Sequence, residues 1–141
     1  MICPETFKII GFDEKFYFMT GSRALDNNKH GIKYSNDSSD YDFVVKIHVR
    51  HLILGSLVER GIKVEESCYN GGFRFCEGSL NFNVITAVDI EYDAWKNALE
   101  ILKYLIESNV KIASLLKNKL FRYAYYEQLR GIYKAMITSA F

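Results

Sequence analysis

The sequence has 141 residues, of which 49% are apolar, 25% are charged and only one is a proline, and its formal net charge is +1. The length suits one compact domain, and an aromatic content of 15% favours a well-filled core over disorder. The almost balanced charge argues against strong binding to duplex DNA, because such binding usually requires a basic excess. No apolar run approaches the roughly 20 residues of a membrane span, so we expect no membrane partner.

Cysteine usage gives an expectation for the cellular compartment. The three cysteines, Cys3, Cys68 and Cys76, are odd in number and lack the spacing of metal ligands. The N-terminal sequence MICPETFKII is interrupted by polar residues and does not resemble a secretion signal. We therefore expect a reduced, cytoplasmic protein in which the thiols act as small apolar side chains.

The first part of the chain predicts two strands and a helix. Residues 15–20 (KFYFMT) are rich in aromatics and stop at Gly21, which is typical of a buried strand that ends in a tight turn. Residues 41–47 (YDFVVKI) predict a second strand. Residues 48–61 (HVRHLILGSLVERG) carry apolar side chains at helical spacing, and the glycine at their end is a suitable helix stop.

Three short segments follow, with turn residues between them. They are 62–69 (IKVEESCY), 73–76 (FRFC) and 80–87 (LNFNVITA). The intervening NGG at 70–72 and EGS at 77–79 accept the positive φ angles that hairpins need. This pattern predicts a β-meander.

The second part of the chain is predicted to be helical. Residues 91–108 (EYDAWKNALEILKYLIES) place their apolar side chains along one stripe, and Asp89 or Asp93 is the expected N-cap. Residues 110–141 continue the helical period, with a predicted break near 117–119.

The order of these elements defines the predicted fold class. A sheet with an embedded helix occupies residues 1–88, and a helical segment follows over 89–141. We therefore expect an α+β, or mixed α/β, fold that forms a single domain over 1–141.

The stretch MTGSRALDNNKHGIKYSNDSSDYDFVV, residues 19–45, carries the candidate chemistry. Gly21 at a strand end lets a phosphate approach backbone N–H groups, and Ser22 adds a hydroxyl donor. Asp40 and Asp42 are two residues apart, so they should share one face of the second strand. Magnesium prefers oxygen ligands and is often shared with substrate phosphates, so the pattern predicts a Mg²⁺ or Mn²⁺ site for phosphoryl or nucleotidyl transfer. The alternative is a polar loop followed by a solvent-exposed aspartate on an edge strand.

The segment TGSRA…SSDYDFVV resembles the signature of the nucleotidyltransferase superfamily with the DNA polymerase β-like fold. In that resemblance Gly21 and Ser22 match the glycine-serine element, and Asp40 and Asp42 match the first two carboxylates. Residues 80–102 look like the strand–turn–helix of small nucleotidyltransferase-like proteins common in phages. The resemblance implies a mixed sheet of about five strands, a nucleoside triphosphate substrate and transfer of a nucleoside monophosphate to a hydroxyl of a protein, an RNA or a small molecule.

The sequence departs from the family pattern at one important position. The place of the third catalytic carboxylate falls on Asn83, whose amide offers an oxygen to a metal but cannot act as a general base. The resemblance therefore leaves a second hypothesis open. The chain is then a catalytically inactive nucleotide- or protein-binding module, an inhibitor or an antitoxin, encoded by a phage. The loop 26–37 is an insertion relative to the family pattern.

Three further features have two interpretations each. Arg23 directly follows the glycine-serine pair and either binds a phosphate bidentately or is a solvated surface residue. Lys29, His30 and Lys33 either steer a polyanion or are part of an ordinary mixed-charge loop. Residues 117–134 (KNKLFRYAYYEQLRGIYK) interleave basic and aromatic side chains. These either stack on a base or form an amphipathic helix whose aromatics pack inward.

Overall fold

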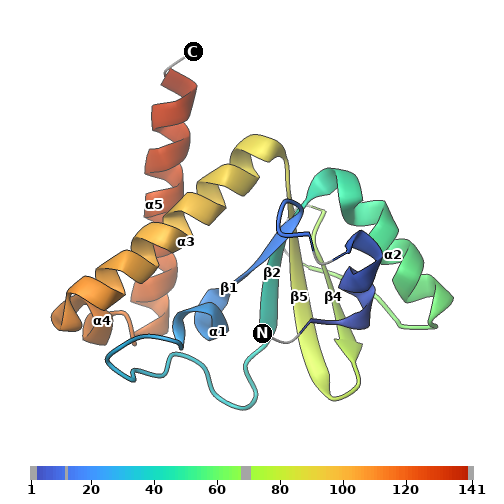
Figure 1. Ribbon diagram of the computed structural model, residues 1–141, viewed down its shortest axis with the longest axis horizontal. Coiled ribbons are helices and arrows are strands. Elements are labelled where there is room, and N and C mark those ends of the chain that lie inside the picture. Colours follow the sequence, from blue (N-terminus) through green and yellow to red (C-terminus); the bar gives the residue numbers. More distant parts are fainter. Residues whose placement is uncertain (1–2, 12, 68–70, 140–141) are drawn as a thin grey trace.

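The computed structural model describes residues 3–11, 13–67 and 71–139, which form a mixed sheet with helices on both faces (Figure 1). The strands are β1 (Tyr17–Thr20), β2 (Tyr41–Lys46), β3 (Glu65–Glu66), β4 (Phe73–Glu77) and β5 (Leu80–Ala87). The α-helices are α1 (Gly21–Leu25), α2 (Arg50–Glu59), α3 (Asp89–Ser108), α4 (Val110–Leu115) and α5 (Lys119–Ser139). Two 3₁₀ helices, η1 (Glu5–Ile10) and η2 (Ile47–Val49), complete the set.

The strand order β1-β2-β5-β4-β3 brings distant parts of the chain together at the centre of the sheet. Strand β2 pairs in parallel with β5, and the other neighbouring strands pair antiparallel. In this register Asp42 lies opposite Thr20 on one side and Asn83 on the other. Three polar residues therefore lie at one level across three adjacent strands.

The two faces of the sheet have separate cores, because alternate residues of each strand point to opposite sides. Figure 1 shows η1 and α2 on one side of the sheet and α3 and α5 on the other. The core on the α2 side contains the buried side chains Phe7, Tyr17, Phe43, Val45, Ile53, Leu57, Phe73, Phe75, Phe82 and Val84. On the α3 side, Val44 and Ala87 pack with Tyr92, while α3, α4 and α5 share a further apolar cluster.

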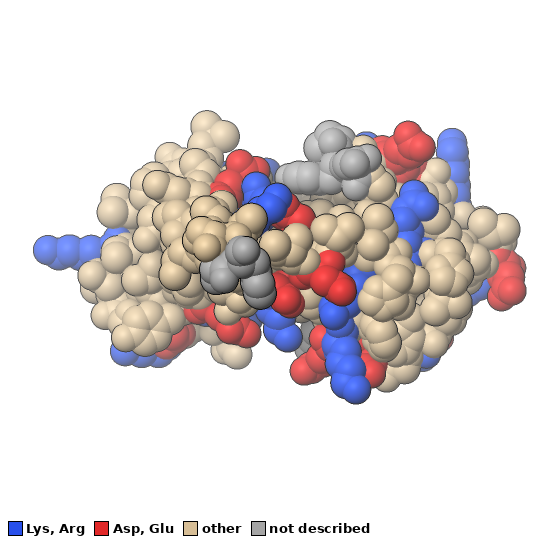
Figure 2. Space-filling model, turned by 90° about the horizontal axis from the view of Figure 1, so that it is seen from above, with Lys and Arg blue, Asp and Glu red and all other residues tan. Residues whose placement is uncertain are grey.

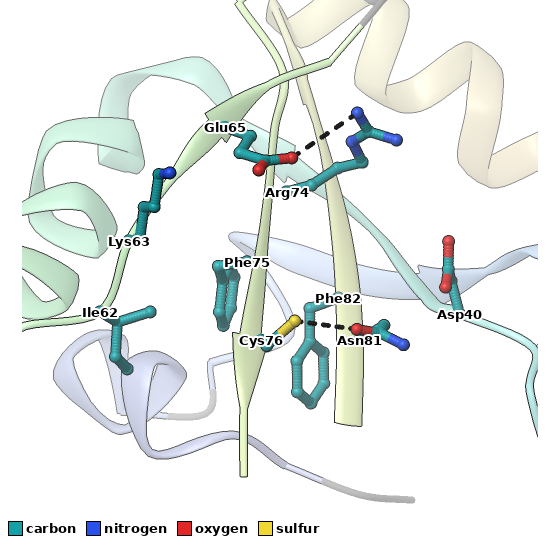
Figure 3. Close-up of a pocket in the computed structure, with 9 residues that line it drawn as sticks. All are labelled: Asp40, Ile62, Lys63, Glu65, Arg74, Phe75, Cys76, Asn81 and Phe82. Atoms are coloured by element: carbon teal, nitrogen blue, oxygen red, sulfur yellow. Dashed lines mark hydrogen bonds and ion pairs between the residues drawn. The ribbon is translucent and has the colours of Figure 1, made fainter. Parts of the chain in front are cut away.

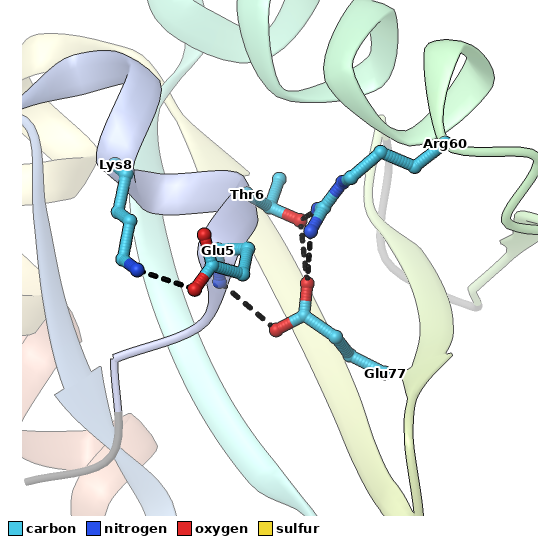
Figure 4. A network of polar contacts seen from close by, with 5 residues as sticks. All are labelled: Glu5, Thr6, Lys8, Arg60 and Glu77. Atoms are coloured by element: carbon cyan, nitrogen blue, oxygen red, sulfur yellow. Dashed lines mark hydrogen bonds and ion pairs between the residues drawn. The ribbon is translucent and has the colours of Figure 1, made fainter.

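A polar network connects the N-terminal helix η1 to Glu77, the last residue of β4 (Figure 4). Glu77 of β4 accepts hydrogen bonds from the Glu5 backbone N–H at 3.0 Å and from the Thr6 hydroxyl at 3.2 Å. The Arg60 guanidinium forms an ion pair with Glu77 at 2.8 Å and also contacts the Thr6 hydroxyl. Helix η1, the end of α2 and strand β4 therefore form one unit.

The C-terminal helices are joined to each other by charged contacts. Glu91 in the first turn of α3 pairs with Arg130 at 2.8 Å and with Lys134, both from α5. The side chain of Asn109 caps α4 by accepting from the N–H groups of Lys111 and Ile112. On the face shown in Figure 2, acidic and basic side chains are interspersed, so this face has no broad area of one charge.

The predicted fold class is confirmed: the protein is a mixed α+β structure with a five-stranded sheet, an embedded helix and a C-terminal helical segment. The predicted meander is present as β3, β4 and β5, and the helix break near 117–119 lies between α4 and α5. The strand predicted over 62–69 is wrong in extent, because Glu65 and Glu66 are the only two of its described residues, 62–67, that join the ladder. Ile62 and Val64 pack against the core without joining the ladder. The end of this predicted strand, 68–69, and the first residue of the predicted turn at 70–72 lie outside the described residues.

The predicted N-cap of α3 is also wrong. The N-cap is Val88, whose carbonyl accepts from the Tyr92 N–H at 2.8 Å, so Asp89 is already inside the helix. The buried Tyr92 ring fixes the start of the helix against the sheet. Asp89 instead lies 3.7 Å from Lys46 at the end of β2. Among the described residues, no helix is long and apolar enough to cross a membrane.

Candidate functional site

A cavity of about 340 Å³ lies between the polar ends of the central strands and helices α3 and α5. The strands and their flanking loops contribute Thr20, Gly21, Ser22, Asp40, Asp42 and Asn83. Helices α3 and α5 and the turn before α5 contribute Trp95, Lys117, Lys119, Arg122, Tyr123, Tyr126 and Glu127. The structure thus brings five of the six predicted site residues together and faces them with cationic and aromatic side chains from the C-terminal segment.

Gly21 is required at the strand end because Asp42 occupies the space beside it. Gly21 has φ +75°, a conformation that residues with a side chain rarely adopt. A β-carbon at this position would lie 2.3 Å from Oδ2 of Asp42. The backbone turn and the carboxylate are therefore in direct contact.

Asp40 and Asp42 both face the cavity, as the alternation of strand residues predicts. Phe43 points into the opposite core, and Tyr41 packs against that core. The alternative interpretation of Asp42 as an exposed residue on an edge strand is wrong, because β2 is paired on both sides and Asp42 is half-buried. Asp40 is exposed and precedes the strand.

Burial raises the pKa of Asp42 from 3.8 to about 6. The negative charge of Asp40 also raises this pKa, while a hydrogen bond from the Asn83 amide and the positive charges of Lys119 and Arg23 lower it. The half-buried Asp42 and the exposed Asp40 repel each other, and a cation that binds between them stabilises both charges.

Asn83 lies beside Asp42 in the parallel ladder and lines the cavity. Its amide N–H favours the ionised form of Asp42, so the nitrogen faces this carboxylate. Its Oδ1 is buried and has no hydrogen-bond partner in the part of the chain that the structure describes. A buried acceptor without a partner is unfavourable, so this oxygen is suited to a ligand or a bound water.

Arg23 is engaged by the loop that leads into Asp40. Its guanidinium donates to the carbonyl oxygens of Ser39, at 2.9 and 3.0 Å, and of Asn36, at 3.2 Å. It also lies over the ring of Tyr41, with 4.1 Å to the ring centroid. In this structure Arg23 therefore positions the Asp40 loop, and its contribution to the cavity is the charge that it places near Asp42.

Helix α5 is held over the cavity by Tyr126. The Tyr126 and Thr20 hydroxyl groups are 2.7 Å apart, and the Tyr126 hydroxyl lies 3.1 Å from the carbonyl oxygen of Trp95. The rings of Trp95 and Tyr126 meet edge to face at 4.8 Å. This arrangement fixes the first turns of α5, and with them Lys119, opposite the two aspartates.

Arg122 is a buried cation at the helical side of the cavity, with 5% of its surface exposed. Its Nη1 donates to the carbonyl oxygen of Leu116 at 3.0 Å, and its guanidinium lies near the rings of Tyr34 and Tyr123. Its Nε is buried and has no partner among residues 3–11, 13–67 and 71–139. A buried arginine with an unused donor is suited to an anionic ligand.

The loop 26–37 is ordered by its own polar contacts and by α3. The Asp26 carboxylate accepts from the backbone N–H groups of Tyr34 and Ser35 at 2.7 and 3.0 Å. The backbone N–H of Lys29 donates to Glu107, and the His30 ring contacts the carbonyl oxygen of Ile106. The loop therefore places Tyr34 in the cavity wall.

The donor set tests whether a metal fits this site. Asp40 and Asp42 supply hard carboxylate oxygens, which suit Mg²⁺ or Mn²⁺. No group of three or more His, Cys, Asp and Glu side chains suited to a metal occurs within the described ranges. A metal here would therefore depend on the two aspartates, with further oxygens from Asn83, a substrate or water.

Thr20 and Tyr34 belong to the cavity but were not predicted from the sequence. The position of Thr20, directly before Gly21 at the strand end, could have identified it, whereas no sequence signal points to Tyr34.

No family model matches the sequence, and no match was found among curated proteins or solved structures.

Proposed function

We propose that the protein binds a magnesium–nucleoside triphosphate in this cavity and transfers a nucleoside monophosphate to a hydroxyl acceptor. The observation that carries the proposal is the contact between the Gly21 turn and the half-buried Asp42 carboxylate, with Asp40 on the same face. The cations of α5 that face these carboxylates are suited to a polyphosphate. A cytoplasmic location would supply both nucleotide and magnesium.

Each residue has a distinct role in this proposal. Gly21 and Ser22 bind phosphate oxygens through backbone N–H groups and a hydroxyl. Asp40 and Asp42 hold the metal, and Lys119 balances the charge of the outer phosphates. When bound, Mg²⁺ supplies charge neutralisation at the phosphates. The amide of Asn83 favours the ionised form of Asp42 by donating a hydrogen bond, against the opposite effect of burial.

The proposed transfer is a single displacement at the α-phosphorus. The acceptor oxygen forms a bond to this phosphorus while the bond to the bridging oxygen of the β-phosphate breaks. Pyrophosphate leaves with the electron pair, and the hydroxyl proton is released to water. The chain's contribution is to position the phosphates and to stabilise their charge.

A second candidate is a nucleotide-binding module without transferase activity. Asn83 favours it, because an amide at this position supplies no negative charge and no general base. Nucleotide binding is common to both candidates, so the two differ only in whether label is transferred.

Calorimetry with ATP, GTP, CTP and UTP in the presence and absence of Mg²⁺ tests the binding. Asp42→Asn should abolish the magnesium-dependent part of the affinity, while Asp93→Asn on the exposed face of α3 should leave it unchanged. Equal affinity of the wild type and Asp42→Asn would refute the metal assignment.

Incubation with α-labelled nucleotides and a cell lysate separates the two candidates. Label transfer that requires Mg²⁺ or Mn²⁺ and is lost in Asp40→Ala supports the transferase. Nucleotide binding without any label transfer supports the binding module.

A further inference from the structure

A second cavity of about 430 Å³ lies at the start of β5, between the β3 side of the sheet and Asp40 (Figure 3). Its polar wall contains Lys63, Glu65, Arg74, Cys76 and Asn81. Its apolar wall is formed by Ile62 and by the edges of Phe75 and Phe82, which belong to the core on the α2 side. Asp40 lines both this cavity and the one described above.

We propose that this second cavity binds the acceptor of the transfer reaction, and that the acceptor is a small hydroxyl compound with an acidic group. The assignment of an acceptor role rests on the proposed function. The assignment of an anion-binding cavity rests on the side chains of the cavity itself.

The shared aspartate is the reason for assigning the acceptor to this cavity. In a displacement at phosphorus, the attacking and leaving oxygens lie on opposite sides of the transferred group. The nucleotide and the acceptor therefore need separate surfaces that meet at the metal-binding carboxylates. Asp40 is a residue at which the two cavities meet.

The size of the cavity favours a small molecule over a macromolecule. A volume of about 430 Å³ lies within the usual range for small-molecule sites, about 300–1,000 Å³. Phe75 and Phe82 are almost fully buried, so they offer no ring face on which a nucleic-acid base could stack.

The charges of the cavity favour an acidic group on the acceptor. Lys63 and Arg74 are opposed by Glu65, but the Arg74–Glu65 pair is 3.9 Å apart and both side chains are more than half exposed. Such a pair is weak, and arginine has five N–H donors, so Arg74 can bind an anion as well. On the side of the cavity away from Asp40, Lys63 and Arg74 outnumber Glu65, so this side carries one net positive charge.

Asn81 supplies a donor between the acidic group and Asp40. The Cys76 thiol donates to Oδ1 of Asn81 at 2.8 Å. This contact leaves the amide nitrogen on the side of Asp40, as Figure 3 shows. The nitrogen can therefore donate to the oxygen of an acceptor hydroxyl next to the shared carboxylate.

Titration of the full-length ¹⁵N-labelled chain with glycerol 3-phosphate, inorganic phosphate and glycerol, followed by NMR, tests the anion site. We expect glycerol 3-phosphate to shift amide signals in β3, β4 and the start of β5, and inorganic phosphate to shift the same signals more weakly. Glycerol alone should not shift them. The double substitution Lys63→Gln/Arg74→Gln should weaken the binding of glycerol 3-phosphate at least fivefold, whereas Lys103→Gln on the exposed face of α3 should not.

Absence of these shifts, equal shifts with glycerol, or unchanged affinity in the double variant would overturn the anion site. The titration needs no nucleotide, so its result is independent of the proposed function. The acceptor role is tested by calorimetry of magnesium–ATP on the same double variant, followed by label transfer with glycerol 3-phosphate as acceptor. If the double variant binds ATP normally and still transfers label to glycerol 3-phosphate as well as the wild type does, the acceptor role is overturned. If the wild type itself does not bind ATP, the proposed function alone is overturned.

Discussion

The hydroxyl groups of Thr20 and Tyr126 lie 2.7 Å apart although the residues are 106 positions apart in the sequence. This contact joins the end of β1 to the middle of α5. Since the Tyr126 hydroxyl also lies 3.1 Å from the carbonyl oxygen of Trp95, one side chain links the sheet and two helices. The position of the α5 cations over the aspartates depends on this link.

Substitution of Tyr126 by Phe should loosen α5 without leaving a large void. Loss of the hydroxyl leaves Thr20 and the carbonyl oxygen of Trp95 without a buried partner, which costs about 1–3 kcal/mol. We expect a lower free energy of unfolding in urea and weaker binding of magnesium–ATP. Tyr104→Phe, at an exposed position on α3, is the control. Equal stability of the two variants would contradict the proposed link.

Substitution of Gly21 by Ala should damage the site more than a similar change elsewhere. Gly61 has φ +68° and open space around its Cα, so Gly61→Ala tests the backbone cost alone, about 1 kcal/mol. Gly21→Ala adds a clash with Asp42. We expect a larger loss of unfolding free energy for Gly21→Ala and loss of nucleotide affinity. Similar losses for both variants would show that Asp42 can move away at no cost.

Substitution of Asp42 by Asn should stabilise the metal-free protein at neutral pH. Burial raises the pKa of Asp42 in the folded state to about 6, so the folded state holds its proton more tightly than the unfolded state. Ionisation of Asp42 therefore lowers the free energy of unfolding. This penalty is absent below the unfolded pKa of 3.8, grows as the pH rises and is complete above about 6. Asp42→Asn removes this penalty, for a gain of about 3 kcal/mol above this pH.

Urea unfolding of both proteins from acidic to neutral pH measures this difference. The stability curves should meet near the unfolded pKa and separate as the pH rises. Saturating Mg²⁺ should stabilise only the wild type and reduce the gap. A difference that does not change with pH would contradict the expected cause.

Substitution of Lys119 by Gln should weaken triphosphate binding. The positive charge of Lys119 lowers the pKa of Asp42, so it acts within the site. Loss of one charge-assisted contact corresponds to a reduction in affinity of about tenfold. Calorimetry should give a larger loss for ATP than for AMP, and the loss should shrink at high salt. Lys103→Gln is the matched control, and an equal effect of the control would exclude a specific role.

Substitution of Asn83 by Asp should place a third carboxylate next to Asp40 and Asp42. The added negative charge should raise Mg²⁺ affinity and lower the stability of the metal-free protein, because three carboxylates then repel one another. Calorimetry with Mg²⁺ alone and thermal unfolding measure the two effects. Unchanged Mg²⁺ affinity would mean that position 83 lies outside the reach of the metal.

Most helices and strands were predictable from local patterns. The aromatic strand before Gly21, the alternation around Asp42 and the apolar stripe of α3 follow from side-chain periodicity. The extent of β3 did not follow, because Ile62 and Val64 are held by packing against the core and not by strand pairing. The start of α3 was misplaced for a similar reason, since the buried Tyr92 determines where the helix meets the sheet.

The candidate site was predictable only in its sheet half. The spacing of Asp40 and Asp42 determines their common face, and Gly21 marks the turn beside them. The other half of the site, which contains Lys119 and Arg122, depends on how α5 packs against the sheet and α3. Sequence periodicity does not determine this packing. The role of Arg23 depends on the path of the loop that provides its carbonyl partners.

The parallel pairing of β2 with β5 also has a consequence for synthesis of the chain. Asp42 leaves the ribosome well before Asn83, and both precede Lys119 at the start of α5. A nascent chain that has reached β5 contains strands β1 to β5, but its two aspartates lack the cations of α5. The proposed nucleotide binding should therefore appear late in translation, only after α5 has been synthesised.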